Sequence, residues 1–224
     1  MIEYKNSNDK TVTAQQFNML KDGEIHDYDD VTGELRKVEN IIYMEKMGIT
    51  RKVYEYYLDP SENKNNIIQQ YTDVAKNYSA SIYLNKQIAF GFEIWDNEDY
   101  DKNGVLKFKS KIVYDNQKRI ILQVYFDLQT NQIIQHTAYR PTKYYFGTSL
   151  DTANGLPNLE LKFTYEFDPN TNQFVTYVKD VNETSGEIHT MNVIEFIELF
   201  GQAFWDAHPY YHSLLPLLPT TTNV

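Results

Sequence analysis

The chain has 224 residues, 42% of them hydrophobic and 15% aromatic, which is enough for a substantial core and excludes a disordered chain. Its 31 Asp and Glu outnumber its 21 Lys and Arg, which gives a net charge of −10. This excess repels phosphate backbones and attracts basic proteins. We therefore expect no nucleic-acid binding and a basic protein as the partner.

Two further features of the composition indicate a compartment. Cysteine is absent, so the chain forms no disulfide and no thiolate metal site, as is typical of proteins from reducing compartments. The first ten residues lack the basic and apolar regions of a secretory signal, and no stretch reaches the roughly 18 apolar residues of a membrane span. We expect a soluble, cytoplasmic protein that does not contact a membrane.

A short helix is predicted near the N-terminus. Thr13 and Gln16 have the spacing of a capping box, in which each side chain bonds the other residue's backbone N–H. Gly23 is a residue that can end such a helix.

Strands are predicted along most of the chain. Residues 159–167 illustrate the pattern, because Leu161, Phe163 and Tyr165 alternate with polar residues as on a half-buried strand. By the same reasoning we predict strands over 35–45, 49–58, 79–84, 87–95, 106–114, 119–127, 132–140, 159–167 and 173–180.

A second helix is predicted after residue 59. Asp59 is a candidate cap, Pro60 suits the first turn, and Glu62 lies three residues after Asp59. One apolar stripe would comprise Ile67, Ile68, Tyr71, Val74 and Ala75. The alternative is a strand through residues 66–72.

One phrase occurs twice and marks turns. "DLQTNQI" begins at Asp127 and "DPNTNQF" begins at Asp168, and in both the Asp can accept backbone N–H groups while Asn131 or Asn172 takes a positive φ. Related turns are predicted in "YDDVTGEL", with Gly33 left-handed, and in "VNETSGEI", residues 181–188. Strands joined by such turns pair as antiparallel neighbours.

The C-terminal region predicts a longer helix over about residues 192–207. Asn192 and Glu195 have capping-box spacing, and Pro209 ends the helix before a tail of residues 208–224. The apolar positions recur at helical intervals: Val193, Phe196, Ile197, Phe200 and Phe204.

Together these elements predict an α+β, predominantly β fold. We expect a single domain over residues 1–224, with a large curled antiparallel meander sheet of about eight to ten strands. The C-terminal amphipathic helix should pack on this sheet, with one or two short helices in the N-terminal half.

The sequence contains no convincing catalytic or metal-binding motif. "DYDKNG", from Asp99 to Gly104, matches the first half of a calcium loop, but Ser110 stands where the bidentate Glu belongs, so we read an ordinary hairpin loop. His208 and His212 are four residues apart but flank Pro209, and we expect them to contact carbonyls at the helix end. We therefore expect no enzyme, metal or cofactor.

The segment "FEIWDNEDYD" combines aromatic and acidic residues, the composition of an interface for a basic partner. The predicted partner-binding residues are Glu93, Trp95, Asp96, Glu98, Asp99, Tyr100 and Asp101. The alternative is a solvated hairpin tip with Trp95 in the core. A second acidic segment spans residues 22–30.

The aromatic-Asp-x-x-Thr-Gly/Asn-x-apolar turns of "YDDVTGEL", "YFDLQTNQI" and "EFDPNTNQF" resemble the degenerate β-hairpin repeats of bacterial antitoxin and immunity proteins, including the MORN-variant type. The resemblance implies a cytoplasmic inhibitor that neutralises a partner by occlusion. A toxin, a nuclease or, for a phage-encoded inhibitor, a host defence protein would fit. The main alternative is a closed, lipocalin-like cup that binds a small ligand.

Overall fold

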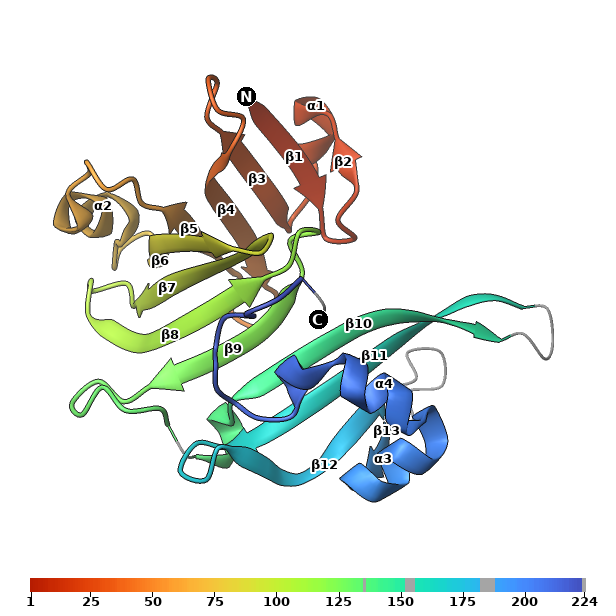
Figure 1. Ribbon diagram of the computed structural model, residues 1–224. Helices are drawn as coiled ribbons and strands as arrows, with labels where there is room; N and C mark the ends of the chain where they lie inside the picture. The colour runs from red at the N-terminus through yellow and green to blue at the C-terminus, as the bar shows by residue number, and fades with distance from the viewer. Residues whose placement is uncertain (135, 152–155, 182–187, 223–224) are drawn as a thin grey trace. The chain divides into compact units, whose positions relative to one another are not determined.

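The computed structural model describes residues 1–134, 136–151, 156–181 and 188–222 (Figure 1). Within these residues the strands form one mixed sheet in the order β13-β12-β11-β10-β9-β8-β7-β6-β5-β4-β3-β1-β2. Neighbours in the sheet are neighbours in the chain except at the β3-β1-β2 end, which confirms the predicted meander. The thirteen strands exceed the eight to ten predicted, mainly because the short strands near the termini have too few residues to show a clear two-residue alternation.

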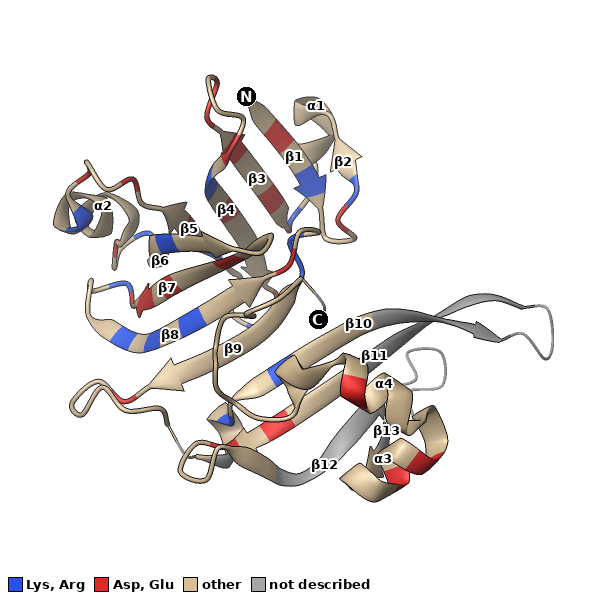
Figure 2. Ribbon diagram, in the orientation of Figure 1, with Lys and Arg blue, Asp and Glu red and all other residues tan. Residues whose placement is uncertain are grey.

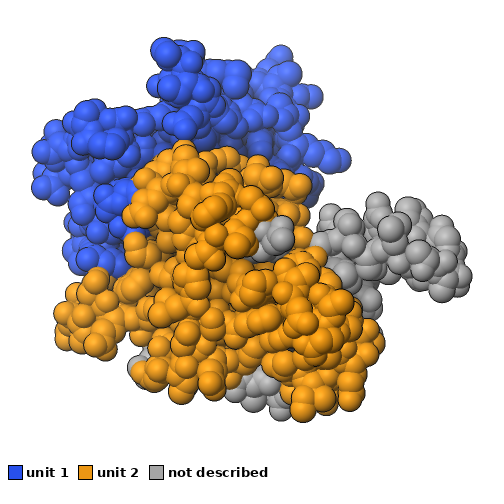
Figure 3. Space-filling model, in the orientation of Figure 1, with its two compact units in different colours: residues 1–85, 96–109 blue, residues 86–95, 110–224 orange. Residues whose placement is uncertain are grey.

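The chain divides into two compact units, shown in different colours in Figure 3. Unit 1 comprises Met1–Asn85 and Asp96–Lys109, and unit 2 comprises Lys86–Trp95 and Ser110–Val224. Three strands contribute residues to both units: β6 (Tyr78–Ala89), β7 (Phe92–Tyr100) and β8 (Leu106–Tyr114). Each unit combines two separate segments of the chain, so the units do not correspond to two domains that follow each other in sequence. The single-domain organisation stays a prediction.

Unit 1 is built on an N-terminal group of strands and two short helices. The elements that lie wholly within it are β1 (Ile2–Asn6), β2 (Thr11–Val12), α1 (Ala14–Phe17), β3 (Gly23–Tyr28), β4 (Leu35–Met44), β5 (Ile49–Tyr57) and α2 (Lys64–Tyr71). One of its cores comprises Ile67 of α2, Ala80 and Ile82 of β6, and Tyr100 of β7.

The N-terminal helix has the predicted cap but not the predicted end. Thr13 and Gln16 form both bonds of the capping box, which confirms the start of α1. The helix ends at Phe17, so the assignment of Gly23 as its end was wrong. A Cβ on Gly23 would lie 2.6 Å from the Lys5 carbonyl oxygen and 2.6 Å from the Phe17 ring, so this position favours glycine because strand and helix approach it closely.

Helix α2 makes one strand pair parallel. It carries the chain from β5 to β6, which pair in parallel with Tyr54 opposite Ala80, whereas the other pairs with a described register are antiparallel. The helix is confirmed over the alternative strand, but it begins after Asn63 instead of Asp59. Asp59 and Glu62 form a separate turn, in which the Asp59 N–H donates to the Glu62 carboxylate at 2.8 Å.

Unit 2 contains the larger aromatic core. Its remaining elements are β9 (Ile120–Phe126), a 3-10 turn (Thr137–Tyr139), β10 (Thr142–Asp151), β11 (Leu156–Asp168), β12 (Gln173–Val181), β13 (Ile188–Met191), α3 (Val193–Phe200), α4 (Gln202–Ala207) and a 3-10 turn (Pro209–Tyr211). The 3-10 turn at Thr137–Tyr139 lies within the strand predicted over residues 132–140, so that strand prediction was wrong for these residues.

The C-terminal helix packs on the sheet as predicted. The ring centroids of Phe196, Phe200 and Phe204 lie 5.1, 4.8 and 6.1 Å from the ring of Phe163 on β11. The capping box of Asn192 and Glu195 is complete. One continuous helix over 192–207 was wrong, because Gly201, at φ +91° and ψ 147°, separates α3 from α4.

The three described turns have the predicted chemistry. In each, the N–H of the left-handed residue donates to the Asp carbonyl: Gly33 to Asp29 (3.0 Å), Asn131 to Asp127 (2.9 Å) and Asn172 to Asp168 (2.8 Å). The φ angles of these residues are +70°, +55° and +59°. The fourth predicted turn, residues 181–188, contains residues 182–187, which lie outside the described residues.

The C-terminal tail is fixed by a buried lysine. Lys143 of β10 is 0% exposed, and its Nζ donates to the carbonyl oxygens of Tyr210 (2.6 Å), Ser213 (2.8 Å) and Pro216 (3.2 Å). The Nζ also lies 3.6 Å from the centroid of the Tyr210 ring. Three donors thus meet three acceptors and an aromatic face, which ties the tail to the sheet of unit 2.

Candidate functional site

The seven predicted partner-binding residues lie along β7 and at the residue after it. Successive side chains of a strand point to opposite faces, so the segment divides by alternation. It is also divided between the units, with Glu93 and Trp95 in unit 2 and Asp96–Asp101 in unit 1. The structure therefore does not bring these residues together as one exposed patch.

In unit 2, Trp95 and Glu93 are both occupied. Trp95 is 8% exposed, in agreement with the alternative that places it in the core, and its Nε1 donates to Glu93 at 3.4 Å. Glu93 forms ion pairs with Lys118 at 2.6 Å and Lys86 at 3.4 Å. Burial raises the pKa of Glu93, but the two ammonium groups outweigh it and hold the pKa below its ordinary value.

In unit 1, one face of β7 contacts helix α2. Glu98 pairs with Lys64 of α2 at 2.7 Å and accepts the Tyr100 hydroxyl, and Tyr100 is itself 8% exposed in the core beneath α2. Asp96 accepts the side-chain amide of Asn85 at 2.8 Å. These residues stabilise unit 1 and present little aromatic surface to a partner.

Asp101 is the acceptor of a tight turn. Its carboxylate accepts the backbone N–H groups of Asn103 (2.8 Å) and Val105 (3.0 Å) and pairs with Lys107 at 3.1 Å. These hydrogen bonds, led by that from Val105, lower the pKa of Asp101 to about 2. Gly104 has a φ of +72°. Among the described residues, no group of three or more His, Asp or Glu is arranged to hold a metal ion.

Asp99 points to the other face of β7, where unit 1 carries a row of polar residues. Strand register aligns Glu3 of β1 with His26 of β3, His26 with Val38 of β4, Val38 with Glu55 of β5, and Glu55 with Ser81 of β6. Register partners share a face of a sheet. Ser81 in turn donates to Asp99 at 2.6 Å, and we call Glu3, His26, Glu55, Ser81 and Asp99 the polar row.

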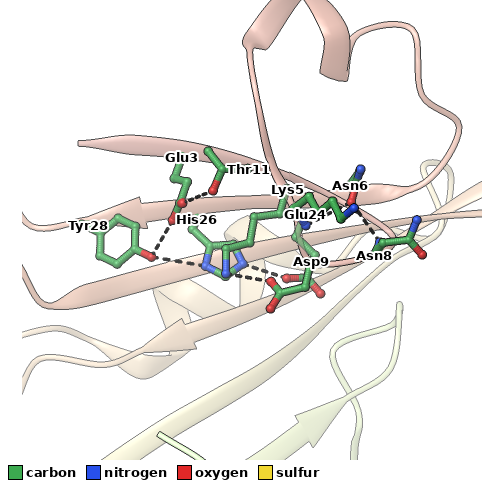
Figure 4. Close-up of polar contacts among 10 residues, drawn as sticks. Glu3, Lys5, Asn6, Asn8, Asp9, Thr11, Glu24, His26 and Tyr28 are labelled. Carbon is green, nitrogen blue, oxygen red and sulfur yellow. Dashed lines mark hydrogen bonds and ion pairs between the residues drawn. The ribbon is translucent and has the colours of Figure 1, made fainter. Parts of the chain in front are cut away.

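The outer end of the polar row is a hydrogen-bonded network (Figure 4). Glu3 accepts the hydroxyls of Thr11 at 2.6 Å and Tyr28 at 3.0 Å, and these two bonds lower its pKa. His26 donates from Nε2 to Glu24 at 2.7 Å, and its Nδ1 lies 3.5 Å from the Tyr28 hydroxyl. The donors to Glu3 are thus neutral hydroxyl groups.

The inner end of the row holds two carboxyl groups that resist ionisation. Burial raises the pKa of Glu55, the charges of Glu24 and Asp99 raise it further, and a 2.8 Å hydrogen bond from Asn40 opposes the rise. Burial also raises the pKa of Asp99, against a 2.6 Å hydrogen bond from Ser81. These carboxyls too are solvated by neutral side chains.

Sequence reasoning missed the polar row although part of its signal was present. The segment "KVYEYY", residues 52–57, places Glu55 on the face opposite Tyr54 and Tyr56, and "YSASIYL" places Ser81 on the face opposite Ile82. Alternation alone therefore identified polar positions. It did not indicate that β1, β3, β5 and β6 lie close together, because the parallel crossover through α2 and the β3-β1 pairing determine that arrangement.

Comparisons with known proteins returned no match to a family model, to a curated protein or to a solved structure. In the part of the chain that the structure describes, no helix has the length and apolar character needed to cross a membrane.

Proposed function

We propose that the protein is a non-enzymatic inhibitor that captures a basic protein, such as a toxin or a nuclease, and blocks it by occlusion. The observation that carries this proposal is the uncompensated negative charge of both units. Unit 1 has 18 Asp and Glu against 13 Lys and Arg, and unit 2 has 13 against 8. A field of one sign over both units steers a cationic partner toward the protein.

The polar row supports the same proposal. Glu3, Glu55 and Asp99 accept hydrogen bonds from neutral side chains, and none of the three forms an ion pair among the described residues. The lack of cysteine and the resemblance of the Asp-x-x-Thr-Asn turns to those of immunity proteins agree with a cytoplasmic antitoxin-like role.

A ligand-binding cup receives less support. β13 and β2 form the two edges of the sheet, so the strands do not close on themselves as a cup requires. In unit 2 the aromatic side chains of α3 and α4 occupy the sheet face that a ligand would otherwise line.

The test is affinity capture from the native host at low and high salt, followed by an activity assay of the captured protein. We expect a basic protein that elutes with salt and whose activity falls stoichiometrically with added inhibitor. Capture of acidic partners alone, or a partner whose activity is unchanged in the complex, would contradict the proposal.

A further inference from the structure

The outer face of α3 combines exposed apolar and acidic residues. Ile194 is 69% exposed and Leu199 is 67% exposed, and Glu195 and Glu198 are exposed beside them. These four positions fall within about 140° of the helix circumference at 100° per residue. Phe196, on the opposite side, is fully buried. The helix therefore packs one apolar side against the core and exposes a second apolar pair, Ile194 and Leu199, to solvent.

No Lys or Arg among the described residues of α3 and α4 adds a positive charge to this face. Figure 2 shows Asp and Glu, but no Lys or Arg, on α3 and α4. The sequence from residue 180 to residue 224 contains six Asp and Glu and no Lys or Arg. Asp206 of α4 is exposed, and it accepts only a neutral amide, that of Gln202 at 2.8 Å, among its described side-chain contacts. Among the residues that the structure describes, Glu195, Glu198 and Asp206 form no ion pair, in contrast to Glu93 and Glu98 on β7.

The two helices are also held rigidly. The capping box fixes the start of α3, and the Phe196 and Phe200 rings pack against Phe163. At the other end, the ring nitrogens of His208 and His212 donate to the Phe204 and Trp205 carbonyls at 2.7 and 2.8 Å, as predicted for the helix exit. A surface held in this way loses little conformational entropy on binding.

We propose that the outer face of α3 and α4 is the docking surface for the basic partner, and that it binds a cationic amphipathic segment of that partner. This inference rests on the function proposed above. Ile194 and Leu199 are the apolar anchors, and Glu195, Glu198 and Asp206 pair with Lys or Arg of the partner.

Charge complementarity selects this occupant over two others. A membrane surface rich in anionic lipids would be repelled by three carboxylates that form no ion pair among the described residues. A second copy of the chain would bring like charges together across the apolar pair. A segment with apolar residues on one side and Lys or Arg at its margins satisfies both features of the face.

The direct test uses a synthetic probe. A labelled amphipathic helical peptide of about 18 residues, with Leu on one face and Lys elsewhere, is titrated by fluorescence anisotropy. We expect 1:1 binding that weakens with salt, and no binding of a matched peptide with Glu in place of Lys. Glu198→Lys should weaken binding by about tenfold or more, and Leu199→Ser by about tenfold.

Matched controls separate this face from the general charge. Glu45→Lys exchanges the same charge on an exposed turn of unit 1, and Leu128→Ser removes an exposed apolar residue elsewhere in unit 2. Both should leave affinity within about twofold. Equal weakening by the control variants, or no binding by the unaltered protein, overturns the proposed surface. Circular dichroism checks folding, and Glu198→Lys tests the surface even where Leu199→Ser fails to fold.

The natural partner, once captured, separates the two proposals. A basic partner that binds the unaltered protein and the α3 variants equally well overturns this docking surface and leaves the proposed function standing. A partner that loses affinity with Glu198→Lys but not with Glu45→Lys supports both. If Asp96→Asn lowers the affinity for the partner and Glu198→Lys does not, the interface lies on β7 and not on α3.

Discussion

Replacing Lys143 by Met tests how the C-terminal tail is held. Lys143 is fully buried and has no carboxylate partner in the part of the chain that the structure describes, and this burial lowers its pKa from 10.5 to about 7. The difference corresponds to about 5 kcal/mol of unfavourable free energy at pH values where the folded amine is still charged. The three carbonyl groups of the tail and the Tyr210 ring bind the ammonium form and offset part of the cost of burying it.

The sign of the pH dependence follows from the two pKa values. Between pH 7 and pH 10.5 the unfolded chain binds more protons at Lys143 than the folded chain, so this residue's contribution to stability rises with pH. Lys143→Met abolishes the titration. The free energy of unfolding of the original protein minus that of this variant should therefore increase by about 2 kcal/mol from pH 7 to pH 9.

The assay is urea unfolding followed by tryptophan fluorescence at several pH values. Trp95 and Trp205 both belong to unit 2, so the signal reports the unit that contains Lys143. Lys118→Met, which removes a lysine whose side chain is 67% exposed, is the matched control and should show no such growth. If the free energy of unfolding of the original protein minus that of Lys143→Met stays constant or decreases between pH 7 and pH 9, the reasoning is refuted. Such a result would mean that the three carbonyl groups keep the buried ammonium charged.

Three further predictions concern the turns, the polar row and the helix break. Asn131→Val and Asn172→Val should each lower the free energy of unfolding by about 1 kcal/mol, because both residues have positive φ. In urea unfolding, Asn131→Gly should leave the free energy of unfolding nearly unchanged. Asn172→Gly should lower it by about 1 kcal/mol, because the Asn172 side chain accepts the Leu215 N–H at 2.7 Å. Equal effects of the two substitutions would contradict this. Glu55→Gln should stabilise unit 1 by about 1 kcal/mol at pH 7 and by less at pH 4, measured by unfolding followed by circular dichroism. The raised pKa of Glu55 in the folded state means that the original protein loses stability as pH rises, and Gln removes this loss. A larger stabilisation at pH 4 than at pH 7 would contradict this. Gly201→Ala should lower stability by about 1–3 kcal/mol, because its backbone angles suit only glycine; an unchanged melting temperature would show that α3 and α4 tolerate a different junction.

Local chemistry explains which parts of the fold were predictable. The Asp127–Asn131 turn was predicted because both its hydrogen bonds and its positive φ depend on residues within five positions. The capping boxes of α1 and α3 were predicted for the same reason. The alternation of "LELKFTYEF" likewise identified the buried face of β11, on which Phe163 and Tyr165 lie.

Features that depend on distant residues were not predictable in this way. The start of α2 moved by one turn because Asn63 competes with Asp59 as a cap, and local propensity does not rank the two. Lys143 resembles any strand lysine in the sequence, and its burial depends on a tail that lies 67 residues or more further along the chain.

The candidate site shows the same limit. The composition of "FEIWDNEDYD" indicated an interface, but the strand places its aromatic residues in buried positions. Three of its carboxylates, those of Glu98, Asp101 and Glu93, are paired with Lys64, Lys107 and Lys118. The exposed apolar pair of α3 was not predicted, because the core-facing stripe of Val193, Phe196, Ile197 and Phe200 already accounts for the amphipathic pattern of the helix. Exposure of Ile194 and Leu199 became evident only with the packed structure.

We propose that the protein acts by presenting an acidic docking surface and not by catalysis. The association rate between the protein and its captured partner, measured by stopped-flow as a function of ionic strength, tests this most directly. We expect the rate constant to fall steeply with added salt, to fall at low salt with Glu198→Lys, and to accompany 1:1 inhibition of the partner. A rate independent of salt, or substoichiometric inactivation of the partner by turnover, would contradict the account.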